Sequence, residues 1–144
     1  MRTLPIILFL FSVLMIISSA SSACDCVMVH PITSYFKSSE YMLVVKTVRI
    51  HVAEEPYYSG TKADVVVSEA LKGGIAAGDT VLFDAEQLTN CSFKFREGKE
   101  YLVFAYRLKD RFVVYNCSYS SDMFFAKKTY RAAKKYMRRM MSSN

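Results

Sequence analysis

The stretch YLVFAYRLKDRFVVYN, residues 101–116, decides the fold. It holds two apolar runs rich in β-branched and aromatic residues, 101–108 and 112–116, on either side of the polar turn Lys109-Asp110-Arg111. Two such runs joined by a short polar turn are typical of a β-hairpin. We therefore expect two neighbouring antiparallel strands here.

Three more runs of the same character precede this hairpin. They are separated by glycine-rich or proline-containing turns and cover residues 40–52, 62–71 and 80–85. Five strands joined by short turns, with no helical stretch between them, predict a sheet that closes on itself to bury its apolar face and its edges. We expect a mainly β fold, a five-stranded antiparallel OB-like barrel.

The periodicity of the chain changes from residue 121 onward. Apolar residues recur at steps of four and three, as on one face of a helix, at Ala126, Tyr130, Ala133, Met137 and Met140. Seven basic residues fill the other positions, namely Lys127, Lys128, Arg131, Lys134, Lys135, Arg138 and Arg139. We predict a C-terminal amphipathic helix with Ser121 and Asp122 as candidate N-caps.

The N-terminus resembles a secretory leader. Residues 4–17 are almost wholly apolar after Arg2, and Ser21 and Ala23 occupy the positions that a signal peptidase favours. We predict that residues 1–23 are a signal peptide and that residues 24–144 form one secreted, extracellular domain. A retained membrane anchor is disfavoured because the apolar run is shorter than the roughly 20 residues that span a bilayer. Acylation of Cys24 is disfavoured because no leucine stands three positions before it.

All four cysteines, Cys24, Cys26, Cys91 and Cys117, follow the leader. An even number of cysteines in a small exported domain predicts two disulfides. A bond between Cys24 and Cys26 would close a strained ring, so each should reach a distant partner, and both such pairings stay open. A structural zinc site needs two short-range ligand pairs, whereas Cys91 and Cys117 are far apart in sequence.

The sequence does not indicate an enzyme. It has two histidines, and it lacks a nucleophile elbow, a His-Glu-x-x-His motif and a glycine-rich phosphate loop. His30, before Pro31, is expected in a local turn, and His51 at a strand end. The net charge of +6 is concentrated in the terminal helix, whose basic face is either simply solvated or attracted to glycosaminoglycan or a membrane surface. Nucleic acid is disfavoured by export. Asn90 and Asn116 begin N-glycosylation motifs, for which we expect partial use at most.

Cleavage before Cys24 would create a metal-binding group. The α-amine of Cys24 has a pKa near 8, so a good fraction is neutral at neutral pH, and its carbonyl oxygen lies one short chelate ring away. Disulfides through Cys24 and Cys26 would hold this bidentate ligand rigid. The catalytic zinc of a metalloprotease keeps a position open for water, and a wedge that displaces this water stops the enzyme.

The same residues resemble a known family, the tissue inhibitors of metalloproteinases, whose amino-terminal domain is a netrin-like barrel. The opening Cys24, Cys26, His30 and Pro31 is similar to the family's Cys-x-Cys-x-x-x-His-Pro. Ala70-Leu71-Lys72-Gly73 and residues 98–103 resemble its hydrophobic-Lys-Gly turn and its Gly-x-x-Tyr-Leu segment. The resemblance covers essentially the whole of residues 24–144. It implies a monomeric, secreted inhibitor of zinc metalloendopeptidases with no cofactor of its own and no membrane attachment after cleavage.

The resemblance also implies roles for particular residues. Cys24 would bind the protease zinc, Asp25 would enter the S1′ pocket, and the disulfides would join Cys24 to Cys91 and Cys26 to Cys117. The remaining protease-binding residues would be Cys26, Val27, Leu88, Thr89 and Asn90.

Two positions depart from the family pattern. Phe36 stands where a third disulfide would begin, so the barrel is either less stable or compensated by the packing of Phe36. Asp25 would carry a carboxylate into an apolar pocket, which costs several kcal/mol or forces protonation. We therefore expect weak inhibition of ordinary matrix metalloproteinases and a target with a basic or wet S1′ pocket. The alternative function is a non-inhibitory netrin-like module that binds matrix polysaccharide or a receptor through its basic helix.

Overall fold

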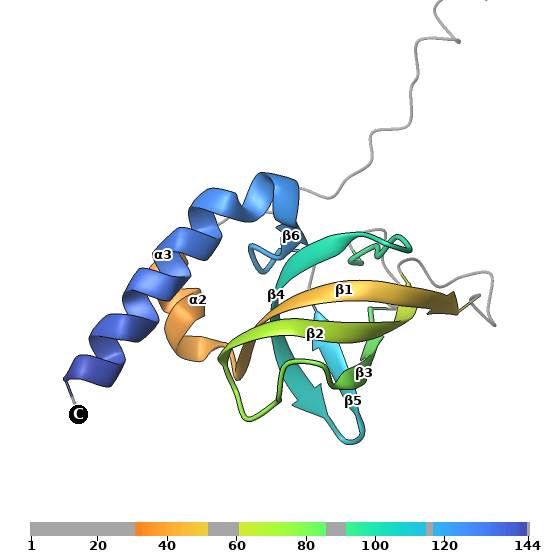
Figure 1. The fold of residues 1–144 in the computed structure, drawn as a ribbon, viewed down its shortest axis with the longest axis horizontal. Coiled ribbons are helices and arrows are strands. Elements are labelled where there is room, and N and C mark those ends of the chain that lie inside the picture. The colour runs from red at the N-terminus through yellow and green to blue at the C-terminus, as the bar shows by residue number, and fades with distance from the viewer. Residues whose placement is uncertain (1–30, 52–60, 86–91, 115–116, 144) are drawn as a thin grey trace, which may run out of the picture.

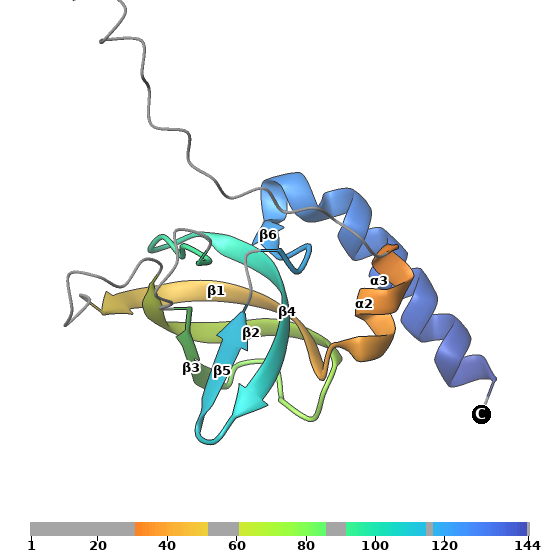
Figure 2. The same cartoon turned by 180° about the vertical axis from the view of Figure 1, so that it is seen from behind.

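The structure is a computed structural model that describes residues 31–51, 61–85, 92–114 and 117–143. These residues form a small β-barrel with two helices packed outside it (Figures 1 and 2). The elements in chain order are α2 (Ile32–Ser38), β1 (Tyr41–His51), β2 (Lys62–Lys72), β3 (Thr80–Asp84), β4 (Glu100–Leu108), β5 (Arg111–Val114), β6 (Ser121–Asp122) and α3 (Met123–Ser142). The predicted mainly β barrel with a C-terminal helix is confirmed.

Five strands close the barrel in the order β1-β2-β3-β5-β4, and β4 pairs back with β1. Four of these pairings are antiparallel, including the β4–β5 hairpin predicted from residues 101–116. The prediction of an antiparallel barrel is wrong at the fifth, because β3 and β5 pair in parallel through Phe83 and Phe112 and through Asp84 and Val113. In a closed ring with an odd number of strands, directions cannot alternate all the way round, so one pair must be parallel.

Strand β1 is buried on both faces near its start. This explains why its first residues do not alternate strictly between apolar and polar side chains. Leu43 and Val45 face the barrel interior, whereas Met42 and Val44 pack under the two helices. A strand covered on both sides reads as a continuous apolar run. The pairing of β1 with β2 shifts register at three points, and such bulges bend and twist a strand as barrel closure requires.

The helices cover a second apolar cluster on the outside of the barrel. Phe36 of α2 is 2% exposed and lies between Phe104 of β4 and Tyr136 of α3, at ring-centroid distances of 6.0 and 5.3 Å. Ala126 and Ala133 of α3 are fully buried against the same cluster. The burial of Phe36 is consistent with the expectation that its packing compensates for the missing third disulfide.

The short helix α2 was not predicted. Its seven residues are too few to show a helical period, and a contact distant in sequence holds its C-terminal end. The Lys72 ammonium donates hydrogen bonds to the carbonyl oxygens of Phe36, Lys37 and Ser39 at 3.2, 2.9 and 2.5 Å. A cation at this position satisfies carbonyls that the end of a helix leaves without partners.

The long helix α3 is confirmed with two differences. Asp122 is its N-cap, since the Asp122 carboxylate accepts a hydrogen bond from the backbone N–H of Phe124 at 2.8 Å, and Ser121 and Asp122 together form the short strand β6. The prediction that Met140 belongs to the buried stripe is wrong, because Met140 is 48% exposed. The last turns of α3 extend past the barrel, so nothing of the sheet covers them (Figure 1).

Candidate functional site

The residues predicted to bind a protease lie outside the described part of the chain, and so does Cys91. We call the predicted protease-binding residues together the predicted protease-binding edge; they are Cys24, Asp25, Cys26, Val27, Leu88, Thr89 and Asn90. His30 and Asn116 also lie outside the described part. Their roles, the glycosylation of both asparagines and the disulfide pairings remain predictions. The structure does describe the residues that follow Cys91 and Cys117 in the chain. Their contacts show how the barrel holds these two segments.

The segment directly after Cys91 is anchored in an aromatic cluster. Phe93, Phe95 and Tyr101 pack edge to face in all three combinations, with centroids 4.8 to 5.5 Å apart. The backbone N–H of Phe95 donates to the Thr61 hydroxyl at 2.6 Å, and that of Arg96 donates to the Tyr101 hydroxyl at 2.9 Å. Burial raises the pKa of Tyr101 above 10.0, with the hydrogen bond from Arg96 acting in the opposite direction. The neutral hydroxyl is thus kept as a fixed acceptor.

The turn that contains Cys117 is anchored on β4. Ser118 and Ser120 are buried and their hydroxyl oxygens lie 2.7 Å apart. The Ser120 hydroxyl also accepts a hydrogen bond from the backbone N–H of Phe104 at 2.8 Å. Cys117 is half-buried and is not a free thiol.

These two anchored segments meet at one hollow of about 480 Å³. Phe93, Lys94 and Arg96 line it from the first segment, and Ser120, Ser121 and Asp122 line it from the second. Phe125, at the start of α3, also borders it and is 77% exposed. We call this site the rim hollow. The fold therefore brings together the chain that follows Cys91 and the chain that follows Cys117, although 26 positions separate the two cysteines.

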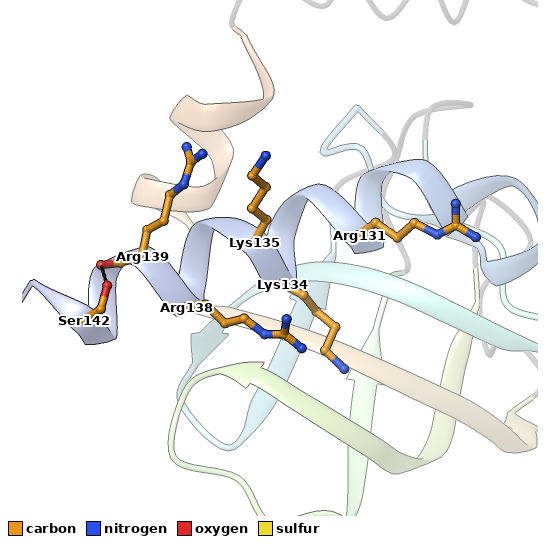
Figure 3. A pocket seen from close by; sticks show the side chains of 6 residues that line it. All are labelled: Arg131, Lys134, Lys135, Arg138, Arg139 and Ser142. Atoms are coloured by element: carbon orange, nitrogen blue, oxygen red, sulfur yellow. Dashed lines mark hydrogen bonds between the residues drawn. The ribbon is translucent and has the colours of Figure 1, made fainter.

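A second hollow, of about 620 Å³, lies along the C-terminal half of α3 (Figure 3). It is lined by five cationic side chains and one hydroxyl, from Arg131, Lys134, Lys135, Arg138, Arg139 and Ser142. We call it the basic hollow. The sequence predicted the basic helix, but it did not predict that these side chains would surround a concave surface.

A polar contact fixes α3 against β2 beside the basic hollow. The Tyr130 hydroxyl donates to Glu69 at 2.5 Å, and the Lys134 ammonium lies 3.0 Å from the Tyr130 oxygen and 2.9 Å from Glu69. The hydrogen bond from Tyr130, and then that from Lys134, lower the pKa of Glu69, and the same contacts raise the pKa of Lys134. Tyr130 was predicted only as an apolar residue of the stripe, so its hydroxyl was missed.

His51 ends β1 as predicted, and its Nε2 lies 3.1 Å from a carboxylate oxygen of Asp64 on β2. A single His–Asp pair at a strand end is a structural contact. In the part of the chain that the structure describes, no group of three or more His, Cys, Asp or Glu residues could hold a metal ion. No described helix is both long and apolar enough to cross a membrane.

No known family model matches this chain, and no curated protein matches it either. The site therefore has to be interpreted from its own residues.

Proposed function

We propose that this chain is a secreted inhibitor of zinc metalloendopeptidases. Cys24, as the first residue of the mature domain, would bind the catalytic zinc of the protease through its α-amine nitrogen and its carbonyl oxygen. The observation that carries this proposal is the sequence Cys24-Asp25-Cys26 directly after a predicted cleavage site. A terminal amine next to a carbonyl is a bidentate ligand, and it would replace the water that the protease needs for hydrolysis.

The anchoring of the barrel supports this role. Disulfides from Cys24 to Cys91 and from Cys26 to Cys117 would tie the N-terminus to two chain segments that are themselves fixed. Phe93 and Phe95 lie in the barrel's aromatic cluster, and Ser120 is bonded to β4. A ligand held in this way loses little conformational entropy when it binds, so more of its interaction energy appears as affinity. The inhibitor would act as a monomer, and the zinc would belong to the protease.

Asp25 sets the class of target. In an apolar S1′ pocket its carboxylate would be desolvated without a partner, which costs several kcal/mol. A pocket that offers a cation or water would avoid that cost. The preferred target is therefore a metalloendopeptidase with a basic or hydrated S1′ pocket. Replacing Asp25 with Thr should raise the affinity for a matrix metalloproteinase with an apolar S1′ pocket by about tenfold or more.

The test compares the mature chain with a version that carries one added alanine before Cys24. The extension removes the chelating amine and leaves every residue of the barrel in place. Inhibition constants are measured on a panel of zinc metalloendopeptidases that includes matrix metalloproteinases and enzymes with basic S1′ pockets. We expect the mature chain to inhibit at least one of them and the extended chain to lose about a hundredfold or more in affinity. Equal inhibition by both chains, or none by either, would refute the proposal.

A further inference from the structure

We propose that the basic hollow on α3 binds a linear sulfated polysaccharide. Figure 3 shows Lys135 and Arg139 projecting from one side of the helix and Lys134 and Arg138 from the other. These pairs stand four residues apart, so each row places successive cations about 6 Å from one another along the axis. A chain of repeating anionic groups can lie along such rows and contact several cations at once.

Most cations of the basic hollow have no acidic partner among the described residues. Helix α3 contains no acidic residue between Met123 and Ser142. Among the described residues, Lys134 is the one cation of α3 in an ion pair, with Glu69. Like charges four residues apart repel each other and destabilise a helix. Arg138 and Arg139 are partly favoured by the helix dipole, because they lie near the C-terminus, but Arg131 and Lys135 lie further upstream. A bound polyanion would relieve this repulsion.

The packing of α3 favours a polysaccharide over a membrane surface. An amphipathic helix binds a bilayer by inserting its apolar face. Here that face is covered as far as Met137, since Ala126 and Ala133 are buried against the barrel and Met137 packs on the same cluster. Beyond Met137, the exposed apolar side chains of the last turn are Met140 and Met141, which are too few to anchor a helix in a bilayer. The exposed Phe124 and Phe125 stand at the opposite end of the helix from the basic hollow. The choice of an extracellular polysaccharide, rather than a nucleic acid, rests on the secretion proposed above.

The basic hollow and the rim hollow are lined by different residues of α3. Their nearest members, Phe125 and Arg131, are six positions apart, which corresponds to about 9 Å along the helix. With the N-terminus bound to a protease as proposed above, the same molecule would hold a matrix polysaccharide through other residues. Binding to matrix would place the inhibitor where extracellular proteases act.

The experiment measures the affinity of the mature chain for heparin as a function of salt concentration. The test variant is R131Q/K135Q/R138Q/R139Q, which keeps good helix formers and removes four charges. The matched control, K37Q/K46Q/K99Q/K109Q, removes four exposed charges from outside α3 and from outside both hollows. We expect the test variant to lose about tenfold or more in affinity at 0.15 M salt and to show a shallower salt dependence, because fewer counterions are released. The control should bind within about threefold of the parent chain.

Three results would overturn the proposal: equal losses in both variants, unchanged binding by the test variant, or tighter binding to anionic vesicles or duplex DNA than to heparin. Thermal unfolding of the test variant should match or exceed that of the parent, which shows that a loss of binding is not a loss of fold. The alanine-extended chain should bind heparin normally, and the test variant should still inhibit protease. Failure of one function therefore leaves the other measurable.

Discussion

The ring of Phe36 lies 5.3 Å from the ring of Tyr136, and this contact joins α2 to α3 over the outside of the barrel. Phe36 is 2% exposed and also stacks on Phe104 of β4. Replacing Phe36 with alanine should therefore leave a cavity under both helices and lower the free energy of unfolding by about 3–5 kcal/mol. Urea denaturation measures this loss.

Phe124 provides the matched control for Phe36. It has the same side chain but is 71% exposed on α3. The substitution F124A should change stability by less than about 0.5 kcal/mol. Similar losses for F36A and F124A would show that Phe36 does not support the helices.

The contact between Glu69 and Tyr130 predicts a pH dependence. The pKa of Glu69 is lowered from its ordinary value of 4.5, chiefly by the hydrogen bond from Tyr130. A lowered pKa in the folded state stabilises the fold above the unfolded pKa, and this contribution is lost as the pH falls through the folded pKa. Compared with E69Q, the parent chain should be more stable by about 0.5 kcal/mol at pH 6, since Glu69 is partly exposed to solvent.

The difference between the parent chain and E69Q should shrink as the pH falls below 4.5 and vanish once Glu69 is protonated. Thermal or urea unfolding at a series of pH values measures it. Glu100, an exposed residue of β4, supplies the control E100Q, which should change stability by less than about 0.5 kcal/mol. A difference for E69Q that persists unchanged at pH 3 would contradict the assignment of this contact.

Two adjacent glycines give a sharp comparison after β2. Gly73 has φ +102°, and a Cβ built on it would lie 2.3 Å from the ring of Tyr41, whereas a Cβ on Gly74 would meet nothing within 4 Å. G73A should therefore lower stability by about 1–3 kcal/mol, and G74A by less than about 0.5 kcal/mol. Equal effects in thermal unfolding would show that the turn rearranges freely.

Thr47 offers a stabilising substitution. It is 1% exposed, and its hydroxyl oxygen has no hydrogen-bond partner among the described residues. A buried hydroxyl without a partner costs about 1–3 kcal/mol, and valine has the same shape without this group. T47V should raise the free energy of unfolding by about 1 kcal/mol. Destabilisation by T47V would mean that the hydroxyl has a partner in the folded protein.

The strands could be predicted from the sequence because each is a run of β-branched and aromatic residues between turn residues. The observed bounds of β1, Tyr41–His51, differ by one residue at each end from the predicted 40–52. Two features were missed. A closed ring of five strands needs at least one parallel pair, but no local pattern in the sequence indicates that β3 and β5 form it. Helix α2 depends on Lys72, which is 34 positions beyond Ser38.

The surfaces of α3 were predicted only in part. The spacing of Ala126 and Ala133 identified the buried face correctly. Met140 has the same spacing but extends beyond the barrel, and periodicity carries no information on how far a partner surface reaches. Phe124 and Phe125 lie off the apolar stripe, and a helical projection of the sequence would have shown that they are exposed.

The most direct test of the central claim is the intact mass and N-terminal sequence of the protein secreted by cells that express the full chain. We predict a chain that begins at Cys24 with an unmodified α-amine and with all four cysteines oxidised. A chain that begins at another residue, or a Cys24 whose amine carries an acyl group, would contradict the proposed chelation of a protease zinc.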